Sequence, residues 1–185
     1  MSAPSDAAAQ DGAVQRFARA LARGYSGQAM ILAMAGWILD QATKTLAVRT
    51  LTARVIDLPG PFHLHLVHND GAAFGLSAPW WLFLVVTVVV AAVVVRNLPR
   101  ATGWLDASAY GLLLAGALGN VTDRLVRPPR FARGEVVDFI GSSVWPTFNI
   151  ADVCITIGFI LLVAGVLMAE HRERRRSENP SPAAA

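Results

Sequence analysis

The chain has 185 residues, of which 54% are hydrophobic and 16% are charged, and its mean hydropathy is +0.46. This composition is more apolar and less charged than that of ordinary soluble domains, so it predicts a membrane protein. The net charge of +3 comes from small basic clusters beside apolar stretches, the pattern that orients membrane proteins, and we expect no nucleic-acid partner.

Four apolar stretches are long enough to cross a hydrocarbon core as helices. They lie at about residues 28–51, 79–95, 103–121 and 150–169. Basic clusters precede the first stretch, separate the second from the third and follow the fourth, which predicts that both termini are cytoplasmic. The third stretch contains small residues, Gly111 and Gly116 among them, that permit close helix packing. The sequence therefore predicts a mainly α membrane protein with four transmembrane helices.

Both ends of the chain are polar. Residues 1–27 contain no apolar block behind a basic start, so we expect a disordered cytoplasmic N-terminal tail and no cleavable signal peptide. Residues 171–185 begin with arginines and continue with Ser, Pro and Ala, so we expect a basic and then disordered cytoplasmic tail. The membrane domain is expected to occupy residues 28–170.

The outer segment at about residues 52–77 is too long for a tight turn. Within it, residues 62–66 alternate between apolar and polar side chains and are flanked by turn-forming residues, which predicts a small outer β-structure. His63 and His65 could share one strand face as metal ligands, but no third ligand has suitable spacing. We therefore favour an edge facing solvent or lipid headgroups, and we predict no metal site.

The second outer segment, at about residues 122–149, is basic on the side where positive charge is unexpected. Its arginines are Arg124, Arg127, Arg130 and Arg133. We keep the topology, because three other basic clusters agree on it, and interpret these arginines as functional or lipid-headgroup contacts.

Several polar residues lie within or at the end of apolar stretches. Asp40 and Lys44 are four residues apart, so on one helix face they can neutralise each other. A buried pair that locks helix packing and a direct contact with substrate fit this spacing equally well. Asn120 and Asp123 share a face at the end of the third stretch, where Arg124 offers Asp123 a cation. We therefore expect Asp123 to be held as an anion that supports the site.

Asp138 and Asp152 stand in apolar runs at the mouths of predicted helices, where an unpartnered carboxylate is costly. Asp138 has no basic residue within four positions, and its apolar neighbours should raise its pKa. Asp152 follows Asn149 at a helix start, where the helix dipole favours an anion. Taken alone, Asp138 could equally be a polar residue of a turn, and Asp152 could be a carboxylate that stabilises a helix terminus. Together, two carboxylates in different environments can act as acid and base on water, the chemistry of aspartic proteolysis.

Five blocks of the sequence together resemble the bacterial lipoprotein signal peptidases, the signal peptidase II family. The blocks are residues 40–44, 68–75, 116–124, 136–139 and 148–152. Any single block would be weak, but their order and spacing around four apolar stretches are specific, and the resemblance covers about residues 28–170. Residues 127–133 form a longer segment than is usual in the family and residues 141–147 a shorter one, so the geometry of these loops is not carried over.

The resemblance implies an aspartic endopeptidase of the bacterial inner membrane, multi-pass, with its active site toward the outer face. Its substrates would be diacylglyceryl-modified prolipoproteins, cleaved on the amino side of the lipidated cysteine, with membrane lipid as a further partner and no metal or organic cofactor. Matched by motif, Asp138 and Asp152 are the catalytic pair. The supporting and substrate-binding residues are Asp40, Lys44, Asn69, Gly71, Asn120, Asp123, Arg124 and Asn149. The oligomeric state stays open, and a monomer is compatible with the sequence.

Two other functions fit parts of the sequence. A small transporter could use Asp40, Lys44 and the later aspartates as a proton relay. Transporter sites, however, lie near the membrane midplane between repeated halves, whereas these acids gather near one interface and the sequence has no internal repeat. A non-catalytic scaffold could bind lipoprotein precursors, with the aspartates only fixing helix packing. A folded Asp138→Asn variant that binds precursor without cleaving it would exclude the scaffold.

Overall fold

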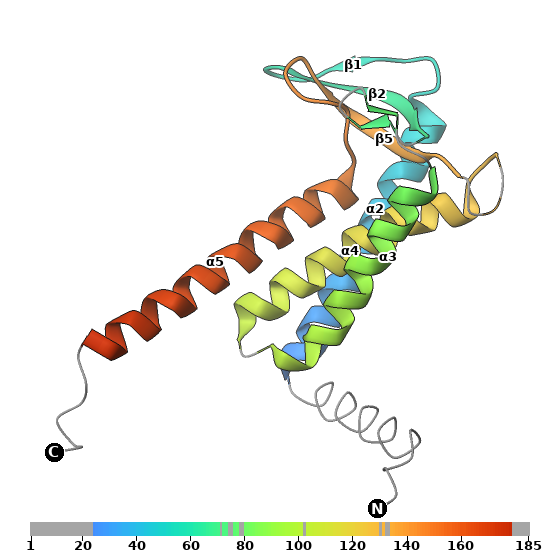
Figure 1. Ribbon diagram of the computed structural model, residues 1–185. Helices are drawn as coiled ribbons and strands as arrows, with labels where there is room; N and C mark the ends of the chain where they lie inside the picture. Colours follow the sequence, from blue (N-terminus) through green and yellow to red (C-terminus); the bar gives the residue numbers. More distant parts are fainter. Residues whose placement is uncertain are drawn as a thin grey trace, which may run out of the picture.

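The computed structural model describes residues 24–70, 72–73, 76–77, 80–101, 103–129, 131 and 134–178. Over these residues the protein is mainly helical, with a small antiparallel sheet at one end of the helices (Figure 1). Residues 1–23 and 179–185 of the predicted tails lie outside the described part of the chain.

The described residues form four long helices that follow the four apolar stretches of the sequence. They are α2 (Gly24–Thr50), α3 (Trp80–Asn97), α4 (Trp104–Val126) and α5 (Ile150–Glu178), and a short 3-10 helix, η1 (Leu98–Arg100), joins α3 to α4. Among the described residues, the stretch Ile150–Arg175 of α5 is long and apolar enough on its own to cross a membrane. The four membrane spans and the cytoplasmic termini stay predictions.

Three helices extend beyond their predicted ends. Helix α2 begins at Gly24, so residues 24–27 of the expected tail are helical, and Ser26 is buried. Helix α4 continues through Val126 because Asp123 and Arg124 point into the protein rather than into water. Helix α5 continues to Glu178, since the Glu and Arg residues of this segment are good helix formers.

Helix α4 is central, because it packs against α2, α3 and α5 (Figure 1). Glycines make the closest approaches possible, as the sequence predicted. A Cβ atom on Gly111 would lie 2.7 Å from the backbone oxygen of Ala29 in α2, and one on Gly116 would overlap the backbone oxygen of Ala151 in α5. Helix packing through small residues is typical of membrane proteins, where apolar side chains gain little by leaving lipid.

The small β-structure is present and is larger than predicted. Its main sheet has three antiparallel strands in the order β1 (Ile56–Asp57), β2 (Phe62–Asn69) and β5 (Val136–Ser142), and two short strands, β3 (Ala72–Ala73) and β4 (Leu76–Ser77), form a separate ladder. Strand β5 lies within the second predicted outer segment, residues 122–149. Its first four residues are buried in succession, so its sequence lacks the alternation that identifies a half-exposed strand.

Candidate active site

The first turn of α5 is held by a reciprocal cap. The backbone N–H of Asp152 donates to Oδ1 of Asn149 at 3.0 Å, and the N–H of Asn149 donates to Oδ2 of Asp152 at 3.2 Å. With α5 beginning at Ile150, this is the capping-box arrangement between the N-cap residue and the third residue of the helix. Asp40 of α2 accepts a further hydrogen bond, at 2.8 Å, from the backbone N–H of Ala151. The helix start thus fixes the carboxylate of Asp152 in place.

Asp138 lies on β5, opposite Val67 of β2, and only 3% of its surface is exposed. Its Oδ1 accepts a hydrogen bond from Nδ2 of Asn149 at 2.6 Å, and its Oδ2 accepts one from Nδ2 of Asn69 at 3.0 Å. Burial raises the pKa of Asp138 to about 6, and although these amide donors oppose the rise, the charge of Asp152 adds to it. The direction is the one that the apolar flanks of Asp138 predicted.

Asn120 of α4 connects Asp152 to the interior. Its Nδ2 donates to Oδ1 of Asp152 at 3.0 Å, while its Oδ1 accepts from Nζ of Lys44 at 3.1 Å and from Nδ2 of Asn149 at 3.4 Å. Because one end of a side-chain amide donates and the other accepts, the cation at Oδ1 orients the donating end toward Asp152. Both carboxylate oxygens of Asp152 are therefore positioned by neighbouring donors.

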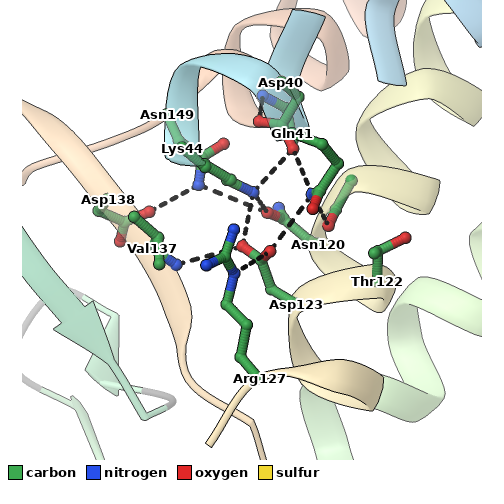
Figure 2. Close-up of polar contacts among 12 residues, drawn as sticks. Asp40, Gln41, Lys44, Asn120, Thr122, Asp123, Arg127, Val137, Asp138 and Asn149 are labelled. Carbon is green, nitrogen blue, oxygen red and sulfur yellow. Dashed lines mark hydrogen bonds and ion pairs between the residues drawn. The ribbon is translucent and has the colours of Figure 1, made fainter. Parts of the chain in front are cut away.

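A buried charge network lies next to Asp138 and Asn149 (Figure 2). Nζ of Lys44 lies 2.9 Å from Oδ2 of Asp40 and 2.9 Å from Oδ2 of Asp123, and all three side chains are 0% exposed. Arg127 adds a second cation, with its Nε 2.6 Å from Oδ1 of Asp123. Asp123 also accepts a hydrogen bond from the backbone N–H of Val137 at 3.2 Å, which ties the network to the strand that carries Asp138. Two anions and two cations balance, as buried charges must.

Asp40 and Lys44 form the expected ion pair, and neither side chain is exposed, which is the geometry that the packing interpretation predicts. Asp123 is a supporting acid in this network, but its direct ion-pair partners are Lys44 and Arg127 rather than the adjacent Arg124. Residues one apart on a helix point in different directions, whereas residues four apart, such as Asp123 and Arg127, share a face.

The arginines of the second outer segment have different positions. Arg127, expected to make functional or lipid-headgroup contacts, contacts buried Asp123. Arg124 is buried, lines the pocket beside the aspartates and interacts electrostatically with Asp138 and Asp123. Arg130 and Arg133 lie outside the described residues.

A pocket of about 460 Å³ opens beside the two aspartates. The sheet and helices α3, α4 and α5 contribute to its lining, which includes Val67, Asn69, Asp70, Thr87, Asn120, Arg124, Val136, Asp138, Trp145, Pro146, Phe148 and Asp152. Polar and apolar side chains share the lining, and the volume suits a ligand the size of a few residues. The pocket can therefore hold a peptide bond against paired carboxylates.

The structure brings nearly all predicted site residues into one region, and Gly71 lies outside the described residues. Two members of the network were missed. Gln41 donates from Nε2 to Oδ2 of Asp40 at 3.1 Å and to Oδ1 of Asp123 at 3.2 Å. Its signal was a polar side chain inside an apolar stretch. For Arg127 no partner was predicted, although its spacing of four residues from Asp123 indicates a shared helix face.

The rings of His63 and His65 stack, with centroids 4.8 Å apart, and lie against Gly141 of β5. Burial lowers the pKa of His65, and the neighbouring His63 lowers it further. In the described part of the chain, no group of three or more His, Cys, Asp or Glu side chains is arranged to hold a metal ion.

The model of the family described as "Signal peptidase (SPase) II" matches residues 32–168. Three relatives named lipoprotein signal peptidase come from Leifsonia xyli subsp. xyli, Rhodococcus jostii and Cupriavidus necator. The Leifsonia protein is 38% identical, and the alignment covers 83% of this chain and 74% of the relative. The Rhodococcus protein is 42% identical, with 75% and 73% covered. The Cupriavidus protein is 41% identical, with 77% and 85% covered.

Two similar solved structures are both titled as a bacterial membrane enzyme. One has a TM-score of 0.66 and 30% identity, and the match covers 86% of this chain and 94% of that one. The other has a TM-score of 0.64 and 31% identity, and the match covers 76% of this chain and 93% of that one.

Proposed function

The chain belongs to the signal peptidase II family, and from that premise we propose how its residues cleave a prolipoprotein. The family membership confirms the resemblance of the five sequence blocks. The protein is a bacterial membrane protease that removes signal peptides from prolipoproteins. The substrate we propose is the diacylglyceryl-modified precursor, cut on the amino side of its lipidated cysteine.

We propose Asp138 and Asp152 as the catalytic pair. The observation that carries this assignment is that Asn149 joins them, donating to Asp138 through its side chain and to Asp152 through its backbone, at the edge of the pocket. Two carboxylates held close together and partly shielded from water favour a state in which one keeps its proton. The raised pKa of Asp138, about 6, makes it the better holder of that proton.

The reaction then needs only the pair and a water molecule. The oxygen of the water molecule bonds to the scissile carbonyl carbon as Asp152 accepts a proton from that water. At the same time the proton on Asp138 hydrogen-bonds to the carbonyl oxygen. The C–N bond of the tetrahedral intermediate breaks as a carboxyl proton passes to the leaving amine, and the pair returns to one shared proton. Asp152 thus serves first as base and then as acid within one turnover, while Asp138 keeps the proton of a pair that titrates as a unit.

The remaining polar residues hold the pair and the substrate. Asn69, Asn120 and Asn149 donate to the carboxylates and fix their rotamers. Arg124 lines the pocket near Asp138 and offers a fixed cation to the substrate carbonyl groups as negative charge develops on them. We place these residues as positioning and substrate-binding groups.

We further propose that α2, α3, α4 and α5 all cross the membrane, with both termini in the cytoplasm and the sheet and active site at the outer face. At 1.5 Å per residue, the shortest of them, α3 with 18 residues, is about 27 Å long, close to the roughly 30 Å of a hydrocarbon core. Exposed apolar side chains on the helices, such as Ile31, Val88 and Phe159, suit contact with lipid. The arginines at the end of α5 suit the cytoplasmic side.

The test is cleavage of a purified precursor in detergent or vesicles, with and without the diacylglyceryl group on its cysteine. We expect cleavage of the modified precursor and little or none of the unmodified one. Folded Asp138→Asn and Asp152→Asn variants should still bind the modified precursor without cleaving it. Equal cleavage of both precursors would contradict the proposed lipid requirement, and turnover by either variant would contradict the proposed pair.

A further inference from the structure

A second pocket, of about 470 Å³, lies at the ends of α4 and α5 that are far from the sheet (Figure 1). Helix α4 contributes Trp104, Asp106 and Tyr110 to its lining, and α5 contributes Val166 and Arg172. Asp106 is half-buried in this otherwise largely apolar space, whereas Trp104 is exposed at the helix end. The described catalytic residues are all at the other end of the same two helices, so this pocket has no part in the chemistry of the dyad.

Helix spacing aligns the two pockets along one surface. On α4, Asp106 precedes Asn120 by 14 residues, and on α5, Val166 follows Asp152 by 14 residues. Fourteen residues are close to four helical turns, so each pair shares a helix face, and the rise is about 21 Å on both helices. The second pocket therefore lies about 21 Å from the catalytic pocket along the same side of the helix pair.

We propose that this pocket receives the basic N-terminal region of the signal peptide, an inference that rests on the proposed function. A secretory signal peptide has a positively charged segment followed by an apolar segment of about 7 to 15 residues. As a helix, that apolar segment is about 10 to 22 Å long. With the cleavage site at Asp138 and Asp152, the positive segment then reaches the level of Asp106. The apolar segment passes Phe159, which lies midway between Asp152 and Val166 and is exposed.

The charges of the pocket make the proposal specific. Asp106 lies next to Gly165, where an added Cβ would be 3.5 Å from its Oδ1, whereas Arg172 follows Gly165 by seven residues, about 10 Å further along α5. A lysine or arginine of the signal peptide is attracted by Asp106 and repelled by Arg172. Neutralising these two residues should therefore change the affinity for a basic signal peptide in opposite directions, which a mere loss of packing would not do.

The experiment uses three lipidated precursors that differ only in the N-terminal region of the signal peptide, which carries two lysines, no charge or two glutamates. Vesicles of phosphatidylcholine avoid attraction of the lysines to anionic lipid. The kcat and KM are measured for the wild type, Asp106→Asn, Asp106→Lys and Arg172→Gln. Glu173→Gln is the matched control, because Glu173 is an exposed carboxylate on α5 that does not line the pocket.

We expect the wild type to have its lowest KM for the lysine precursor. Asp106→Asn should raise that KM by about two- to fivefold, the range of a partly exposed ion pair, and Arg172→Gln should lower it. Asp106→Lys should prefer the glutamate precursor, and Glu173→Gln should keep the wild-type order.

Two results would overturn the inference. One is a change in KM that is equal for all three precursors in the Asp106 variants. That result is expected if Asp106 binds a lipid headgroup or contributes to helix packing. The other is a wild type that does not distinguish the precursors. Both leave the proposed function intact, because cleavage still occurs. Failure of the folded wild type to cleave any lipidated precursor would instead contradict the proposed function, and this inference with it.

Discussion

Asp40 makes two separable contributions, and substitution can measure each. Its Oδ2 pairs with Lys44 at 2.9 Å, and its Oδ1 accepts the backbone N–H of Ala151 in the first turn of α5 at 2.8 Å. Asp40→Asn removes the charge but can keep an acceptor for Ala151. Asp40→Ala removes both. The difference in stability and in kcat between Asp40→Asn and Asp40→Ala therefore measures the contact of Asp40 with α5.

The magnitudes follow from burial. Breaking a buried ion pair typically costs about 3 to 5 kcal/mol, but Lys44 keeps Asp123 at 2.9 Å, so we expect about 2 to 3 kcal/mol for Asp40→Asn. Asp40→Ala leaves the N–H of Ala151 without its acceptor, which adds about 1 to 3 kcal/mol. Because Asp152 follows Ala151 directly, the alanine variant should also lower kcat, whereas the asparagine variant should retain more of it.

The measurement is reversible unfolding of the purified variants in mixed micelles, together with kcat at saturating lipidated precursor. Thr43→Ala is a suitable control, since Thr43 lies beside Asp40 and bonds only to backbone carbonyls of its own helix. Equal stability and equal kcat for Asp40→Asn and Asp40→Ala would refute the role of the contact to α5. Wild-type stability in both would refute the ion-pair argument.

Four further predictions concern the dyad and its surroundings. In folded protein, Asp138→Asn and Asp152→Asn should abolish turnover, while Asp123→Asn should keep a measurable rate. Turnover by Asp138→Asn together with none by Asp123→Asn would reassign the catalytic pair to Asp123 and Asp152. The raised pKa of Asp138 means that the folded state holds this proton up to about pH 6, so the group's contribution to stability should be lost as pH rises from about 4 to 6. For the same reason kcat/KM should fall above about pH 6. A pH profile of kcat/KM that is flat from pH 6 to 8 would contradict this. Arg127→Gln should lower the free energy of unfolding by about 1 to 2 kcal/mol, because it removes a charged hydrogen bond to a buried carboxylate, and unchanged denaturation would show that the bond is dispensable. Gly116→Val should prevent the normal packing of α4 on α5 and lower the melting temperature, whereas an unaltered melting temperature would show that the helices can separate without loss.

The helices and the two aspartates were predictable from sequence because their signals are local. An apolar run indicates a membrane helix by its length, and Asp138 and Asp152 stood out as carboxylates in apolar surroundings. The partners of Asp123 were not predictable in the same way. Neighbours in sequence suggested Arg124, but Lys44 approaches Asp123 from another helix, and nothing in either segment alone specifies that contact.

The third strand shows a similar limit. Residues 136–139 are buried in succession, so they lack the alternation from which strands are recognised. Their pairing with β2 joins segments about 70 residues apart. Long-range pairing of this kind depends on the assembled helices. Asn149 is a further example, because a single side chain both caps α5 and holds Asp138, and sequence spacing predicted only its place in the site.

The reciprocal cap at the start of α5 has a consequence for the order in which activity develops during synthesis. Asp152, its cap Asn149 and the strand that carries Asp138 all come late in the chain, whereas Asp40 and Lys44, which secure them, come early. A ribosome therefore completes the first three long helices before it adds the two proposed catalytic aspartates. When α5 forms its first turn, the same hydrogen bonds that begin the helix place Asp152 beside Asp138. A chain that ends before that turn lacks Asp152, and with it one of the two proposed catalytic carboxylates.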